Sequence, residues 1–213
     1  MAGKWLTLPV LVAVGCATIR GVRAPVGTVP DTYEAQWRAA AALATAAENS
    51  TNAAERAAAA RQGIVHARRA RELNPASVEG HYFYAVNVGW LAEADRSYGL
   101  DAVGEMERAL QCAIARDEKY DRAGPLRLLA ILHLRTPPPP TSIGSPRKAL
   151  RLLQRAVQLC PDHPENYLYL AEALRDTGQR DEARAALDKV LAAPQRADWQ
   201  EQARKLRDQL ARP

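Results

Sequence analysis

The sequence has 213 residues, of which 47% are hydrophobic and 25% charged, with 29 Lys and Arg against 24 Asp and Glu. This composition predicts one globular domain with a substantial core, and its alanine-rich, strand-poor character favours helices. The net charge of +5 is mild and the two signs alternate along the chain, so a basic surface for nucleic acid is not expected.

The first sixteen residues, "MAGKWLTLPVLVAVGC", place one lysine before an apolar run over 5–14. The run is shorter than the roughly 20 residues needed to span a bilayer, and it has the length of a signal-peptide core. The end of this stretch, "AVGC", resembles a bacterial lipobox. The resemblance implies a signal peptide over 1–15 and a covalent lipid on Cys16. The alternatives are an uncleaved anchor and an unrelated apolar segment.

Residues 16–30 carry Gly and Pro without periodicity, which predicts a flexible tether. The lipid would anchor the body to a membrane of the bacterial cell envelope, facing the periplasm. No aspartate follows Cys16, and resemblance to known sorting signals then favours the outer membrane.

The remaining chain predicts an all-α domain over 31–193 and a capping helix within 194–213. Apolar periodicity and capping residues set the expected boundaries. Helices are predicted over 31–48, 53–73, 77–95, 101–116, 123–135, 146–159, 164–177, 180–192 and 197–211.

A repeat relates the last predicted helix pairs. Ala149, Leu153 and Ala156 recur 34 positions later as Ala183, Leu187 and Val190. This period and its pattern of small and large residues are typical of tetratricopeptide repeats. One helix pair cannot bury its apolar face alone, so pairs must stack. The sequence therefore predicts a tetratricopeptide-like α-solenoid of about four helix pairs plus a C-terminal capping helix.

The stretch "HLRTPPPPTSIGSPRKAL" over 133–150 interrupts the third pair. Proline cannot continue a helix, so the four prolines end one helix and predict a stiff, extended segment. Ser145 is expected to cap the next helix, with Pro146 at its first position. We expect this loop to project at the rim of the repeats and to contact a partner or a second subunit.

The phrases "GHYFYAVNVGWLAEA", "DEKYDRAGPLRLLAILHLRTP" and "SIGSPRKALRLLQRAVQLCPDHPENYLYLAEAL" resemble the TatT family. These are tetratricopeptide lipoproteins associated with TRAP-type solute transport. The resemblance covers roughly 30–193 and implies a trimer with a ligand-accessible cavity or pore that docks a periplasmic substrate-binding protein. The proline run here is longer than in the family, and the family has no catalytic motif.

The first helix of each pair should line the concave face of such a solenoid. Aromatic walls with a few polar groups suit a small-molecule or peptide site, and an arginine could hold a carboxylate with two hydrogen bonds. The expected groove residues are Tyr82, Val86, Asn87, Trp90, Arg127, Ile131 and Arg135. The alternative is that these side chains belong to the core.

No enzyme motif is present, so we expect a non-catalytic protein with no catalytic residues, no metal site and no cofactor beyond the lipid on Cys16. The four histidines are dispersed, and Cys112 and Cys160 are expected to be buried thiols. Two functions remain open. One is an accessory to solute transport that binds a small ligand. The other is a pilotin-like assembly scaffold that grips a peptide of an envelope complex.

Overall fold

The structure is a computed structural model, and it describes residues 29–193 and 196–211, apart from the side chains of Arg96 and Leu100. The predicted signal peptide, the predicted lipidation site Cys16 and most of the predicted tether lie outside the described residues. The chain divides into two compact units, 1–117 and 118–213, and each is described by itself. All regular structure in the described residues is helical.

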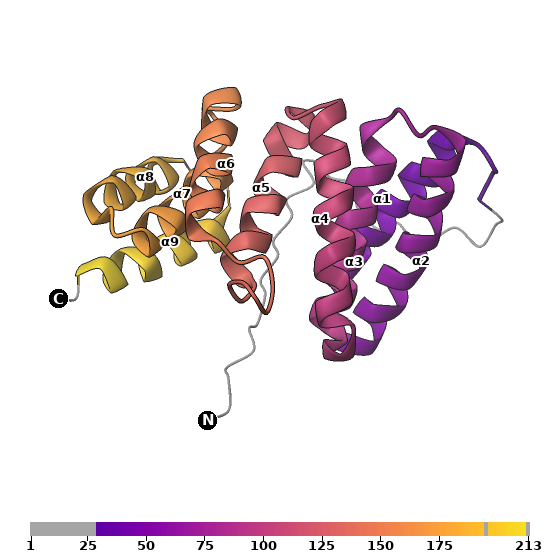
Figure 1. The fold of residues 1–213 in the computed structure, drawn as a ribbon, viewed down its shortest axis with the longest axis horizontal. Helices are drawn as coiled ribbons and strands as arrows, with labels where there is room; N and C mark the ends of the chain where they lie inside the picture. The colour runs from indigo at the N-terminus through magenta and orange to yellow at the C-terminus, as the bar shows by residue number, and fades with distance from the viewer. Residues whose placement is uncertain (1–28, 194–195, 212–213) are drawn as a thin grey trace. The chain divides into compact units, whose positions relative to one another are not determined.

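The N-terminal unit consists of two antiparallel helix pairs, drawn from indigo to magenta in Figure 1. Each helix packs against the next along the chain, and the first also contacts the third. The helices are α1 (Tyr33–Asn49), α2 (Ala53–Leu73), α3 (Val78–Ala94) and α4 (Gly99–Arg116), with a short 3-10 turn, η1 (Arg96–Tyr98), before α4.

Short polar side chains and buried alanines explain why α1 and α2 form where they do. Thr32 accepts a hydrogen bond from the amide of Ala35, and Asn52 accepts from the amides of Ala54 and Glu55. The facing side chains are small, which lets the two backbones approach closely. The buried alanines of these two helices are Ala40, Ala44, Ala47, Ala57, Ala60, Ala67 and Ala70.

The C-terminal unit continues the pattern and ends in a single helix. Gly178, with φ of 84°, makes the turn between the helices of the last pair, a conformation that favours glycine. The helices are α5 (Tyr120–Arg135), α6 (Pro146–Leu159), α7 (Pro164–Asp176), α8 (Arg180–Ala192) and α9 (Ala197–Ala211). The last of these packs on α7 and α8 through Trp199, Leu206 and Leu210. The predicted fold of four helix pairs and a capping helix is confirmed.

The proline loop between α5 and α6 differs from the predicted extended segment. Residues 139–141 form a turn, and the amide of Ser142 reaches the carbonyl of Pro138 at 3.4 Å. The base of the loop is closed by hydrogen bonds from Gly144 to the Pro137 carbonyl and from Ser145 to the His133 carbonyl. The extended prediction was wrong because these backbone bonds reverse the chain, while the expected Ser145 cap is present.

Candidate functional site

The four predicted groove residues of the N-terminal unit lie inside it. Tyr82, Val86, Asn87 and Trp90 are each at most 3% exposed. They belong to a stretch of α3 in which every residue from 80 to 91 is buried, because α1, α2 and α4 all pack against this helix. An all-round apolar helix is expected to be buried in this way. These side chains lie in the core, as the alternative to a groove expects, and their role in binding stays a prediction.

The Asn87 side chain of α3 places a polar amide between α1 and α2. Its Nδ2 donates to the carbonyl of Ala40 on α1 at 3.0 Å and to the carbonyl of Phe83 at 2.8 Å. On the opposite side, a Cβ added to Gly63 of α2 would lie 2.0 Å from Asn87 Oδ1. The amide thus lies against the backbone of Gly63, where a side chain would have no room, and this explains why α2 carries glycine at this position.

Trp90 is covered by a charged side chain from α2. The guanidinium of Arg56 lies 5.7 Å from the indole centroid and forms an ion pair with Glu93 at 3.0 Å. Arg56 also donates to the carbonyls of Ala47 and Ser50 at the end of α1. This arrangement fastens the first helix pair to α3 and places Trp90 in the packing of the unit.

The C-terminal unit contains a buried polar network centred on Arg127, a predicted site residue. The Arg127 side chain is 1% exposed, and its Nε lies 3.0 Å from Glu165 Oε2. Its Nη1 donates to Asn166 Oδ1 at 3.0 Å and to the carbonyl of Arg122 at 3.2 Å. The carboxylate that Arg127 holds in this structure therefore comes from α7 of the same chain.

The same network holds an unusual backbone segment at the start of α5. Asp121, Arg122 and Ala123 have φ values of 46°, 56° and 65°, in the left-handed region that residues other than glycine seldom adopt. The carbonyl of Arg122 accepts hydrogen bonds from both Arg127 and Asn166 Nδ2. These two donors fix the left-handed turn, so regular helix begins only after Ala123.

Arg135 and Ile131 continue this interface between α5 and α7. Arg135 lies 2.6 Å from Glu172, with both side chains mostly buried, and Ile131 is in the core. Tyr169 lies between the two acidic positions. Its burial and the charges of Glu165 and Glu172 raise the pKa of its hydroxyl far above the usual range. Two arginines of α5 thus pair with two glutamates of α7 along a largely buried interface.

The acidic and amide partners in this network, Glu165 and Asn166, are absent from the predicted site. They follow directly after His163 and Pro164, at the start of a helix whose later, fully buried positions are apolar or aromatic. His163 is also buried, and its ring packs edge-on against Trp199 of α9 at 5.5 Å. The polar run "HPEN" at a helix start is the sequence feature that could have indicated these two residues.

Cys112 and Cys160 are each half-buried instead of fully buried as predicted. Within the described residues, no group of three or more His, Cys, Asp or Glu side chains is arranged to hold a metal ion. None of the described helices combines the length and the apolar character that a membrane span requires.

Two families match different parts of the chain. The family described as regulator of microtubule dynamics protein 1-3 matches residues 26–123, which contain α1 to α4. A tetratricopeptide-repeat family matches residues 144–210, which contain α6 to α9 except the last residue. No curated protein sequence matches the chain.

Solved structures with the same arrangement cover most of the chain. A thermophilic tetratricopeptide protein of Thermus thermophilus is 19% identical, covers 85% of this chain and 84% of its own, and has a TM-score of 0.61. MamA is 19% identical with a TM-score of 0.53, covering 83% of this chain and 77% of its own. Yeast Tom70 is 16% identical with a TM-score of 0.54, covering 84% of this chain and 40% of its own. The chain thus has the fold of a tetratricopeptide-type α-solenoid.

Proposed function

We propose that this protein is a non-catalytic interaction module, held at a membrane of the bacterial cell envelope by a lipid on Cys16. The observation that carries the proposal is the succession of four helix pairs with its capping helix, a fold shared with a tetratricopeptide protein over more than four fifths of the chain. Repeats of this kind offer extended surfaces to other proteins.

The partner we propose first is a periplasmic substrate-binding protein of a TRAP-type transporter. The resemblance of the sequence to the TatT family supports this choice, and it also suggests a homotrimer. In this role the protein is an accessory to solute transport that binds a small ligand and docks the substrate-binding protein.

The second candidate is a pilotin-like or assembly scaffold lipoprotein that binds a peptide segment of an envelope complex. One observation favours it. The side chains expected to line a ligand site, among them Asn87 and Arg127, are bonded to groups of their own chain. Binding through the outer surfaces of the helix pairs requires no change in those bonds.

The first experiment is affinity purification of the lipidated protein from crosslinked native membranes, with mass spectrometry of the proteins recovered. We expect a periplasmic substrate-binding protein together with copies of this chain. Recovery of secretion, pilus or outer-membrane assembly components would establish the scaffold function in its place. A C16S variant is the control, because it lacks the lipid and should leave the membrane fraction.

The proline loop provides a second test of the same proposal. Deleting residues 139–141 removes the exposed turn and keeps the closed base at Pro137 and Gly144. We expect unchanged helical content by circular dichroism and reduced recovery of the partner or of the homo-oligomer. Full recovery of both would show that the loop makes no contact in the assembly.

A further inference from the structure

Two arginines on α2, Arg68 and Arg71, gather around one tyrosine of α3. The Arg71 guanidinium lies 4.8 Å from the ring centroid of Tyr84, and that of Arg68 lies 5.6 Å from it. Arg68 Nη2 also donates to the Tyr84 hydroxyl at 3.3 Å. Cation–π contact of this kind holds a guanidinium in place while leaving its N–H groups available.

Tyr84 is itself held rigidly. The residue is 5% exposed, and its hydroxyl donates to Glu105 of α4. Tyr98, just before α4, donates to the same carboxylate oxygen at 3.2 Å. Burial and the neighbouring Glu105 raise the pKa of the Tyr84 hydroxyl, which keeps it protonated. Glu105 therefore accepts hydrogen bonds from two tyrosines, and these bonds fix the Tyr84 ring against which the two guanidinium groups lie.

Arg68 and Arg71 differ from four other arginines of this unit, which are each neutralised by a carboxylate. Four arginines form ion pairs with carboxylates, namely Arg38 with Glu34, Arg56 with Glu93, Arg61 with Asp95, and Arg69 with Asp31 and Glu72. Among the described residues, neither Arg68 nor Arg71 has a carboxylate within ion-pair distance. The nearby Glu72 lies 2.9 Å from Arg69.

The local charge balance favours a negatively charged ligand. Arg68 and Arg71 contribute two positive charges, and Glu105 contributes one negative charge. The charges of Arg71 and Arg116 both act on the buried His81 and help to lower its pKa, so a third arginine adds to the positive field near α3. Arg116 itself donates to the carbonyls of Pro75 and Cys112.

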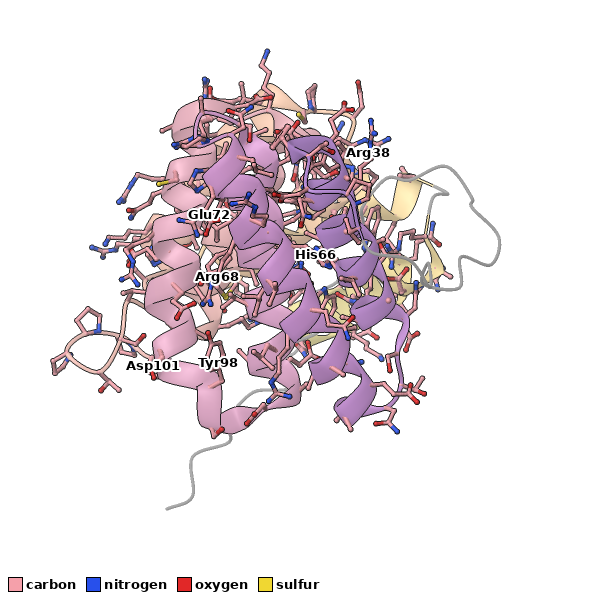
Figure 2. All side chains as sticks on the ribbon, turned by 90° about the vertical axis from the view of Figure 1, so that its right-hand side faces the viewer. Arg38, His66, Arg68, Glu72, Tyr98 and Asp101 are labelled. Carbon is pink, nitrogen blue, oxygen red and sulfur yellow. The ribbon has the colours of Figure 1, made fainter. Side chains whose placement is uncertain are left out.

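We propose that Arg68 and Arg71 bind a carboxylate-bearing segment of a partner protein. A guanidinium offers parallel N–H groups that match the two oxygens of a carboxylate, and preorganised arginines lose little freedom on binding. Val65 lies one turn before Arg68 on α2 and is 62% exposed, so an apolar residue beside the acidic group would find a contact. Figure 2 shows this side of the unit, with Arg68 on α2 and Tyr98 beside α4. The inference rests on the proposed role as an interaction module and names the chemistry of its partner.

The test uses the mature chain and a blocked hexaglutamate peptide, with hexaglutamine as the neutral probe. Binding is followed by NMR through the side-chain Nε–H signals of Arg68 and Arg71. We expect hexaglutamate to move both signals and hexaglutamine to leave them in place. The R68Q/R71Q variant should lose at least about tenfold in affinity, because each charge-assisted hydrogen bond typically contributes about that factor.

Two variants separate a shaped site from general charge attraction. The R38Q/R151Q variant loses the same two charges at exposed positions elsewhere and should bind as the natural protein does. The R68K/R71K variant keeps both charges and loses the planar N–H pairs, so we expect it to bind several-fold more weakly. Equal loss in R68Q/R71Q and R38Q/R151Q, or unmoved Arg68 and Arg71 signals, would overturn the proposal. Movement of these signals by inorganic phosphate but not by hexaglutamate would also overturn it, in favour of a phosphate ligand.

The crosslinking experiment distinguishes failure of this site from failure of the proposed function. If R68Q/R71Q recovers the same partners in the same amounts as the natural protein, the site is not used and the interaction function stands. If the natural protein recovers no partner at all, the interaction function itself fails. Selective loss of a partner from R68Q/R71Q supports the site. Thermal unfolding by circular dichroism confirms that each variant is folded.

Discussion

Arg127 and Glu165 form an ion pair at 3.0 Å in which the two side chains are 1% and 0% exposed. The pair joins α5 to α7, and its arginine also holds the carbonyl of Arg122. Burial of a charge is costly unless its partner and its hydrogen bonds are all present. The pair therefore makes the C-terminal unit sensitive to single changes at either position.

We expect R127M to lower the free energy of unfolding by about 3–5 kcal/mol, because it leaves the Glu165 carboxylate buried without its cation. The double variant R127M/E165L removes both charges and should lose less than R127M alone. Urea unfolding monitored by circular dichroism measures both. R155A, which removes the exposed partner of Glu118, serves as the control and should shift the midpoint very little. An equal loss in single and double variants would show that burial of the charge is not the dominant cost.

Gly63 should tolerate no side chain. In G63A the new methyl group would lie 2.0 Å from Asn87 Oδ1, so the amide must move and lose its bonds to Ala40 and Phe83. We expect a loss of about 2–4 kcal/mol in the free energy of unfolding, measured by urea titration.

The matched control for G63A is G104A, within α4 of the same unit. Its new methyl group would meet only the tip of Arg108, at 3.4 Å. Alanine favours helix over glycine, so this variant should be more stable by about 0.5–1 kcal/mol. A loss of stability in G104A similar to that in G63A would contradict the assigned role of Asn87.

The left-handed turn at the start of α5 makes a separate prediction at its exposed middle residue. Arg122 has φ of 56°, a conformation that costs a residue with a side chain about 1–2 kcal/mol. R122G relieves this cost, but glycine has greater freedom when unfolded, which costs about 0.5–1 kcal/mol. The variant should therefore have equal or slightly higher stability. R122V adds a branched Cβ and should be less stable than the natural protein. We expect the urea midpoint to fall from R122G through the natural protein to R122V. The reverse order would exclude a left-handed turn.

The stability of the N-terminal unit should fall as the pH is lowered from neutral. Burial lowers the pKa of His66 and of His81 below the value of about 6.5 that a histidine has when unfolded. The unfolded state then binds more protons in this range, so stability rises with pH and is lost as the pH falls through about 6.5.

Urea unfolding at pH values of about 7.5, 6.5 and 5.5, on either side of the unfolded histidine pKa, measures this dependence. His66 Nδ1 lies 2.8 Å from Gln36 Oε1. H66Q should reduce the slope, because glutamine can still bond to Gln36 and does not titrate. The carboxylates whose pKa values are lowered, such as Asp31, act at more acidic pH and leave this window unaffected. An unchanged slope in H66Q would contradict the assigned burial of the imidazole.

Most of the helical architecture could be predicted from the sequence because its signals are local. The predicted bounds of α2, α3 and the four helices from α6 to α9 lie within one residue of the observed ones, and Ser145 caps α6 as expected. Apolar periodicity, N-caps and prolines act over a few residues and leave direct traces in the sequence.

The candidate site could not be predicted to the same extent because it depends on contacts between distant residues. Arg127 and Glu165 lie 38 positions apart, and only the packing of α5 on α7 brings them together. The left-handed turn at Arg122 is likewise held by Asn166, on α7. For α3, the sequence does show an apolar helix, but its periodicity does not reveal that three neighbours cover every side of it.

Gly144 has a consequence for how the protein can be altered. The carbonyl oxygens of Thr136 and Pro137 lie 2.1 and 2.7 Å from the place a Cβ would take, and the Gly144 amide donates to Pro137. This closure sits between the helices and the exposed turn at 139–141, so the turn can be replaced without altering α5 or α6. This turn is therefore a suitable position for inserting an epitope tag or a fluorophore-binding sequence.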